Sequence, residues 1–209
     1  MSRIRRLTDS CLLVTTDGEA TLFDPGFHTF LEGVIDLESI GDVTRVFVTH
    51  EHADHVNPDF VKWLIERKSD LVVYSNQAVA DLLDGHGIEV SVEAPEGTTV
   101  EDVLHERLPT GARPPNRSWT IDGVITHPGD SHEPTITAPI MALPLLAPWG
   151  SVTGAVEFAR RIQPERVIMI HDFFMSDSGR VRIRNLAKNV LAESGIEMLG
   201  LDWGDHLTI

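Results

Sequence analysis

Short apolar runs alternate with amphipathic stretches along the chain, and this pattern predicts a mixed α/β protein. Apolar runs bounded by turn-forming residues predict strands at residues 11–15, 20–24, 43–49, 71–74, 88–92, 99–104, 119–126, 140–146, 166–170 and 196–201, followed by a last short strand. Apolar positions at helical spacing predict a helix capped by Asn57-Pro58, a short helix around residues 79–83, one at 152–162, and a long one closed by Gly195.

The order of these elements indicates layers of helix packed on sheet. We expect a single domain over residues 1–209, with one or two sheets and the helices outside them. The pattern alone does not distinguish a sandwich of two sheets from one open sheet.

The net charge of the chain limits the kinds of molecule that it can bind. The chain has 32 acidic and 17 basic residues, a formal net charge of −15. Such a protein repels polyanions, so we expect no nucleic-acid partner. The only cysteine, Cys11, cannot form an intrachain disulfide, which fits a reducing compartment and a cytoplasmic location. No apolar run reaches the length of a membrane span, so we expect no membrane partner.

One segment concentrates side chains that bind metals. His50, His52, Asp54 and His55 lie within six residues, directly after the predicted strand at 43–49. In extended chain, positions two apart point the same way, so His50 and His52 can aim at one point, and the following turn can aim Asp54 and His55 at a neighbouring one. Imidazole and carboxylate ligands without cysteine suit zinc, manganese or iron.

This motif, His-x-His-x-Asp-His at a strand end, resembles the signature of the metallo-β-lactamase superfamily. Asp24-Pro25-Gly26 is similar to an early element of that family, and Gly129-Asp130-Ser131 is similar to the segment that supplies its bridging carboxylate. His171, after the strand at 166–170, resembles its late histidine. The chain most resembles the compact branch that includes L-ascorbate-6-phosphate lactonase. The resemblance implies a four-layer αββα sandwich, and covers most of the chain.

The family requires one more histidine ligand before the bridging aspartate. The candidates are His86, His105 and His127, with His132 just after. His105 follows a predicted strand and precedes a Pro/Gly loop, as that ligand does in the family, so we choose His105, with His127 as the alternative.

The resemblance then implies two divalent ions, zinc first and manganese or iron next. One ion would bind His50, His52 and His105; the other would bind Asp54, His55 and His171. Asp130 and a water or hydroxide would bridge them, with Asp54 as the catalytic residue that orients the hydroxide or moves its proton. Asp24 would orient a metal-bound histidine from outside the ligand set.

The residues that contact the substrate are harder to identify from sequence. Arg113 and Arg117 flank the loop after His105 and would bind a phosphate or carboxylate, although solvated loop positions explain them as well. His132 would reach the leaving group or only pack, and Trp149 would form a pocket wall or only pack. We therefore expect a small-molecule substrate that can be anionic, and self-association of the chain is open.

The predicted activity is hydrolysis of a small ester, lactone or phosphodiester. Two other functions use the same residues: an iron-dependent oxidoreductase similar to thiol dioxygenases, and a non-catalytic metal-binding protein. Metal content separates iron chemistry from hydrolysis, and intact ligands argue against the non-catalytic alternative.

Overall fold

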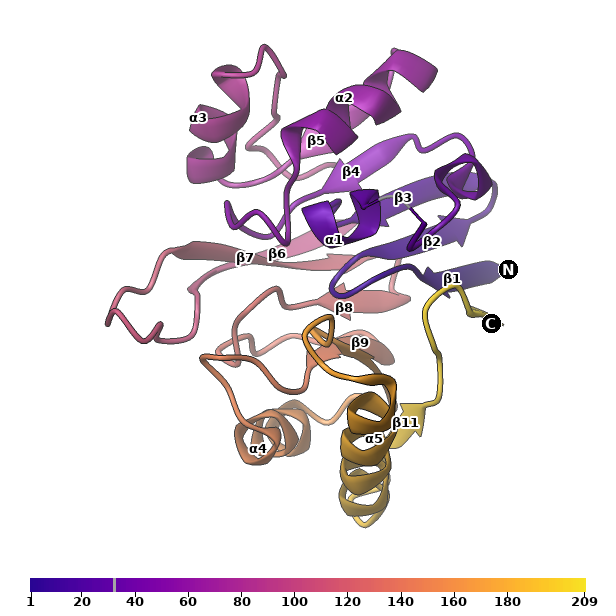
Figure 1. Ribbon diagram of the computed structural model, residues 1–209, viewed down its shortest axis with the longest axis vertical. Coiled ribbons are helices and arrows are strands. Elements are labelled where there is room, and N and C mark those ends of the chain that lie inside the picture. The colour runs from indigo at the N-terminus through magenta and orange to yellow at the C-terminus, as the bar shows by residue number, and fades with distance from the viewer. Residues whose placement is uncertain (32) are drawn as a thin grey trace. The chain divides into compact units, whose positions relative to one another are not determined.

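The structure is a computed structural model that describes residues 1–31 and 33–209. The described chain divides into two compact units. Unit 1 comprises residues 1–96 and 202–209, and unit 2 comprises residues 97–201. In the part of the chain that the structure describes, each unit contains one six-stranded mixed sheet (Figure 1). The predicted α/β class is confirmed, while the prediction of a single domain stays a prediction.

Unit 1 is built on a sheet whose strands follow the order β12-β1-β2-β3-β4-β5. The strands are β1 (Ser2–Arg6), β2 (Leu12–Thr16), β3 (Glu19–Phe23), β4 (Arg45–Phe47), β5 (Val72–Tyr74) and β12 (His206–Thr208). Strands β1, β2 and β3 pair antiparallel, and β3, β4 and β5 run parallel to one another. The carboxyl ends of β3, β4 and β5 therefore meet at one edge of the sheet.

The helices of unit 1 are α1 (Phe27–Phe30), a 3-10 turn η1 (Leu37–Ile40), α2 (Pro58–Arg67) and α3 (Gln77–Asp84). Asn57 caps α2 by accepting a hydrogen bond from the Phe60 amide, with Pro58 in the first turn, so the predicted helix start is confirmed. Apolar side chains of α2 and α3, including Phe60, Leu64 and Leu83, pack with strand residues such as Val46 in one buried cluster.

Unit 2 has the strand order β11-β10-β9-β8-β7-β6. Its strands are β6 (Thr98–Leu104), β7 (Pro115–Ile121), β8 (Ile125–His127), β9 (Ile140–Pro144), β10 (Arg166–Ile170) and β11 (Glu197–Leu199). Strands β6, β7 and β8 pair antiparallel, and β8, β9, β10 and β11 pair parallel. Helices α4 (Val152–Ile162) and α5 (Asp177–Ala192) contact each other and bury Phe158 and Leu191 against β9–β11.

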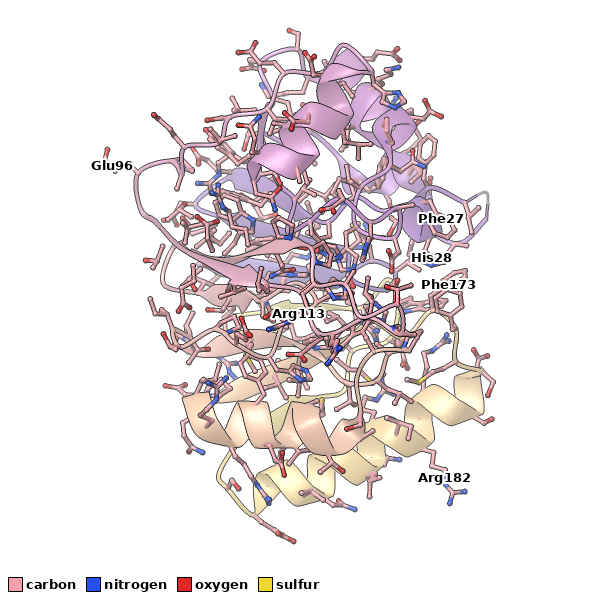
Figure 2. The ribbon with its side chains drawn as sticks, turned by 90° about the vertical axis from the view of Figure 1, so that its left-hand side faces the viewer. Phe27, His28, Glu96, Arg113, Phe173 and Arg182 are labelled. Atoms are coloured by element: carbon pink, nitrogen blue, oxygen red, sulfur yellow. The ribbon has the colours of Figure 1, made fainter. Side chains whose placement is uncertain are left out.

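Several predicted elements are wrong in detail. The strand predicted at 119–126 is two strands, because Asp122 and Gly123 both have positive φ and form a tight turn between β7 and β8. The strand predicted at 88–92 reduces to one bridge between Ser91 and Tyr74 beside the edge strand β5. His28, which lies outside the sequence motifs, is buried on α1 beside Phe27 (Figure 2).

Among the described residues, no helix is long and apolar enough to cross a membrane.

Candidate metal centre

The metal-binding motif of unit 1 lies at the edge where its parallel strands end. Asp24 directly follows β3, and His50 follows β4 after Val48 and Thr49. Because β3 and β4 are paired in parallel, the two segments leave the sheet side by side. After His52 the chain turns sharply, as the amides of His55 and Val56 both donate to the His52 carbonyl.

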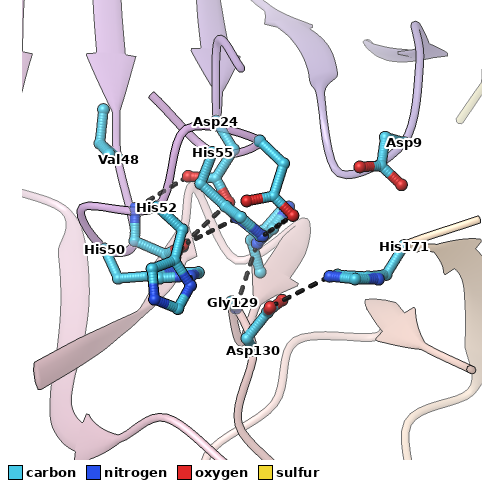
Figure 3. A network of polar contacts seen from close by, with 12 residues as sticks. Asp9, Asp24, Val48, His50, His52, His55, Gly129, Asp130 and His171 are labelled. Carbon is cyan, nitrogen blue, oxygen red and sulfur yellow. Dashed lines mark hydrogen bonds and ion pairs between the residues drawn. The ribbon is translucent and has the colours of Figure 1, made fainter. Parts of the chain in front are cut away.

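Asp24 and Thr49 orient His50 and His55; Figure 3 labels Asp24 and both histidines. One Asp24 oxygen accepts the Thr49 amide at 2.8 Å; the other accepts the Thr49 hydroxyl at 2.9 Å and lies 2.7 Å from His55 Nδ1. Since the single hydroxyl hydrogen of Thr49 points to Asp24, His50 Nδ1 at 3.0 Å is the donor to Thr49 Oγ1. Both rings are therefore held with Nδ1 protonated and the lone pair on Nε2, the form that binds metals. Sequence reasoning had missed Thr49.

The nitrogen and oxygen atoms of this motif form two close pairs. His50 Nε2 lies 3.0 Å from His52 Nδ1, and His55 Nε2 lies 3.8 Å from an Asp54 oxygen. Neighbouring ligand atoms on a tetrahedral ion with bonds of about 2.0–2.2 Å are about 3.3–3.6 Å apart. One separation is shorter and the other longer than this range, so both pairs lie near the spacing of two ligands on one ion.

The Asp24-Pro25-Gly26 segment and the residue after it pack directly against the backbone of the metal-binding motif. The Phe27 amide donates to the Ala53 carbonyl, and the Asn57 amide donates to the Pro25 carbonyl, both at 2.9 Å. A Cβ atom at Gly26 would lie 1.7 Å from the Asp54 carbonyl oxygen. Only glycine allows this close approach of two backbone segments.

In unit 2, three further candidate ligands follow strand ends. His105 follows β6, Asp130 follows β8 after Pro128 and Gly129, and His171 follows β10. All three side chains are buried, with His171 only 5% exposed. His171 has φ of +63°, an uncommon conformation outside glycine, which indicates that its placement is enforced by the surroundings.

One oxygen of Asp130 is the meeting point of these side chains. Asp130 Oδ2 lies 3.3 Å from His105 Nε2 and 3.1 Å from His171 Nε2, the latter contact being drawn in Figure 3. The same oxygen accepts a hydrogen bond of 3.0 Å from Trp149 Nε1, and the indole ring meets both imidazoles edge-on. His105 Nδ1 lies 2.6 Å from the Glu106 carbonyl oxygen, which can only accept, so His105 presents Nε2 to Asp130.

The backbone around Asp130 is fixed by its neighbours. The Asn116 side chain accepts the Asp130 amide and donates to the Pro128 carbonyl, while His127 Nδ1 accepts the Gly129 amide. His127, the alternative ligand, thus holds the loop that carries Asp130. Asn116 was missed by sequence reasoning, since an Asn in a Pro-rich loop gives no signal of its tertiary partners.

Comparison with known proteins identifies the family. Residues 5–171 match the family described as the metallo-beta-lactamase superfamily, which is most of the chain. The chain belongs to the metallo-β-lactamase superfamily. Its two mixed sheets with flanking helices have the α/β sandwich class of that superfamily. Protein Rv0786c of Mycobacterium tuberculosis is 27% identical over 186 residues, which cover 82% of this chain and 84% of that protein.

Two solved structures share the superfamily fold with this chain. A protein from Parabacteroides distasonis gives a TM-score of 0.72 at 21% identity, covering 94% of this chain and 90% of its own. Igni18, a metallo hydrolase from Ignicoccus hospitalis, gives 0.75 at 16% identity, covering 99% and 98%. At these identities the likeness concerns the fold alone.

The donor set fits the metal that this superfamily implies. Among the described residues, those that could hold a metal are His50, His52, Asp54 and His55 in unit 1, and His105, Asp130 and His171 in unit 2. These are the seven positions expected from the sequence; their role as ligands stays a prediction. Imidazole and carboxylate groups at ligand spacing, most of them buried, are the donor chemistry of zinc, manganese or iron sites.

The other predicted site residues have identifiable partners. Arg113 donates to the His105 carbonyl and pairs with Glu133 at 2.5 Å, an interaction that lowers the pKa of Glu133. Arg117 makes two hydrogen bonds to Asp102. Both guanidinium groups therefore have acceptors within their own unit.

His132 is packed as well as hydrogen-bonded. Its ring stacks on Phe158, and Nε2 lies 3.3 Å from the Pro144 carbonyl. Burial lowers the pKa of His132, which favours the neutral ring with Nε2 as the donor to that carbonyl. His132 is thus packed in this structure, and a role toward the substrate or leaving group stays a prediction.

Proposed function

We propose that this chain is a metallohydrolase that binds two divalent ions, with zinc first among them, and cleaves a small ester, lactone or phosphodiester. The observation that carries the proposal is the convergence of His105, His171 and Trp149 on Asp130 Oδ2. A carboxylate oxygen between two imidazole nitrogens has the arrangement of a bridging ligand, and membership of the superfamily supports the same assignment.

The proposed ligand set combines the four motif residues with His105, Asp130 and His171. His50, His52 and His105 would hold one ion, Asp54, His55 and His171 the other, and Asp130 would serve both. When bound, two such ions supply a hydroxide nucleophile at neutral pH and stabilise developing negative charge on oxygen.

The residues of the chain have separate tasks in this proposal. Asp24 holds the proton on His55 Nδ1 and so keeps that ring in its ligand form. Asp54 is 21% exposed, so its carboxylate reaches solvent and can accept the proton that the attacking water loses. Trp149 donates to Asp130 and fixes the plane of the carboxylate.

Finer assignments follow the same proposal. The substrate would be a small molecule, with no nucleic acid and no membrane as partner, and the site of action would be the cytoplasm. The similarity to the L-ascorbate-6-phosphate lactonase branch makes lactones a first substrate class to screen.

The test is the metal content of the purified full chain, measured by elemental mass spectrometry without chelator. We expect about two zinc or manganese ions per chain, reduced in His105→Ala and Asp130→Ala and unchanged in His86→Ala, which alters an exposed histidine outside the motif. Metal-loaded protein is then screened against esters, lactones and phosphodiesters. About one iron per chain would favour the oxidoreductase, and no metal after reconstitution would refute the proposal.

A further inference from the structure

A pocket of unit 2 opens beside the candidate ligand His171. Its walls come from two loops that follow the neighbouring parallel strands β9 and β10. The loop after β9 contributes Leu146, Ala147 and Pro148; the loop after β10 contributes Phe174 and Met175 next to His171 and Asp172. His171 forms part of its wall, so the pocket reaches one of the candidate ligands.

Phe174 is an unusual surface residue. Its side chain is 73% exposed, and among the exposed large apolar residues of the described chain only Met1 is more so. Phe173 precedes it and meets its ring edge-on (Figure 2 labels Phe173). A largely exposed phenyl ring three residues from the candidate ligand His171 contributes little to folding, whereas it would gain from contact with an apolar ligand.

The charges around the pocket disfavour an anionic occupant. Among its described lining residues there is no lysine or arginine, and the one acidic group, Asp172, is buried. The guanidinium group of Arg180 lies 4.0 Å from the Asp172 carboxylate and also pairs with Asp177. Arg113 and Arg117, the cations expected to recognise a phosphate, are bonded to Glu133 and Asp102.

We infer that this pocket binds an alkyl or aryl group of the substrate, next to the bond that is cleaved. The preferred substrates are then neutral esters or lactones that carry such a group, rather than phosphodiesters. This inference rests on the proposed hydrolase function and names its substrate class.

The test uses the metal-loaded full chain and two measurements. The first is hydrolysis of p-nitrophenyl acetate, butyrate and hexanoate. The second is calorimetric binding of acetamide, butyramide and hexanamide as neutral probes, which needs no turnover. We expect kcat/KM and affinity to rise about fourfold per buried methylene. In Phe174→Ala that dependence flattens, and in Ala147→Trp, which fills the pocket, hexanoate loses its advantage over acetate.

Leu186→Ala is the matched control, since Leu186 is an exposed apolar residue on α5 that does not line this pocket. It should keep the wild-type dependence on chain length. Equal dependence in wild type and Phe174→Ala, or no dependence at all, overturns the pocket inference. Chain-length-dependent binding without hydrolysis of any ester leaves the pocket standing and refutes the hydrolase, so the two failures are distinguishable.

Discussion

Asp24 acts on two histidines from a position outside the ligand set. It accepts directly from His55 and, through the Thr49 hydroxyl, fixes the protonation of His50. A carboxylate in this place determines which ring nitrogen carries the proton, and a histidine in the wrong tautomer cannot bind a metal with the intended atom.

We expect Asp24→Asn to weaken metal binding by about 10- to 100-fold, because the amide can no longer hold both protons in place. Titration of the metal-free protein with zinc, followed by calorimetry, measures the effect. Asp42→Asn, at an exposed position, is the control. Affinity unchanged from wild type would contradict the orienting role.

Trp149 gives a second residue-scale prediction. Trp149→Phe keeps an aromatic ring between His105 and His171 but removes the hydrogen bond to Asp130. A hydrogen bond to a charged group contributes about 1.5–3 kcal/mol, so metal affinity should fall by about tenfold or more. Competition with a coloured chelator measures this, and Trp63→Phe provides the comparison. An affinity equal to that of Trp63→Phe would leave Trp149 a packing residue.

The seven candidate ligands were visible in the sequence, His50, His52, Asp54 and His55 through their close spacing after a predicted strand, and the other three through the resemblance to the family. The roles of Trp149, Thr49 and Arg113 were not, because each depends on a partner distant in sequence or on a tautomer. Arg113 shows the limit: the sequence indicated a cation near the site, but only the fold supplies Glu133 as its partner.

Among the secondary-structure elements, predictions succeeded where local chemistry is decisive. Arg166–Ile170 and the capped helix at Pro58 were found because a continuous apolar run and an Asn-Pro pair are strong signals. β1 was missed because its sequence is mostly polar and charged, although alternate residues are buried. Its place in the sheet depends on pairing with β2 and β12, which local pattern cannot reveal.

The contact between Gly26 and the motif loop predicts a severe effect of a small change. Gly26→Ala forces the two backbone segments apart, because the new Cβ would overlap the Asp54 carbonyl. We expect a loss of at least about 1–3 kcal/mol in the free energy of unfolding, together with weaker metal binding. Gly200→Ala, where a Cβ meets nothing within 4 Å, is the control for urea denaturation. Equal midpoints for the two variants would refute this packing argument.

At the scale of the whole molecule, the proposed function couples metal binding to folding. Metal bound only to the folded chain would stabilise it by about 2.7 kcal/mol per site when free metal is 100 times its dissociation constant. Adding EDTA should therefore lower the unfolding temperature, and added zinc should restore it. Asp130→Ala should show a much smaller response. A chelator-insensitive transition in wild type would contradict metal binding by the folded state.

The reactivity of the buried Cys11 thiol measures whether unit 1 opens. Burial raises the pKa of its thiol far above the usual range; the hydrogen bond with Thr29 lowers it by less, and the nearby carboxylates of Asp24 and Asp9 add smaller increases. The raised pKa means that stability from this group is full below about pH 8.5 and declines as pH rises above it. We expect negligible reaction with a thiol reagent at pH 8 in the native state and stoichiometric reaction in urea. Rapid native labelling would show that unit 1 opens.

The pairing of β1 with β12 has a consequence for how the protein is made. Residues 2–6 lie beside residues 206–208 in one sheet, so unit 1 takes its edge strand from chain that follows all of unit 2. During synthesis β12 follows residues 97–201, so until then β1 is an exposed edge strand of an incomplete sheet. Unit 2 is continuous in sequence and can complete its own sheet first. The nascent residues 1–96 are therefore the part of the chain that most needs protection from aggregation during synthesis.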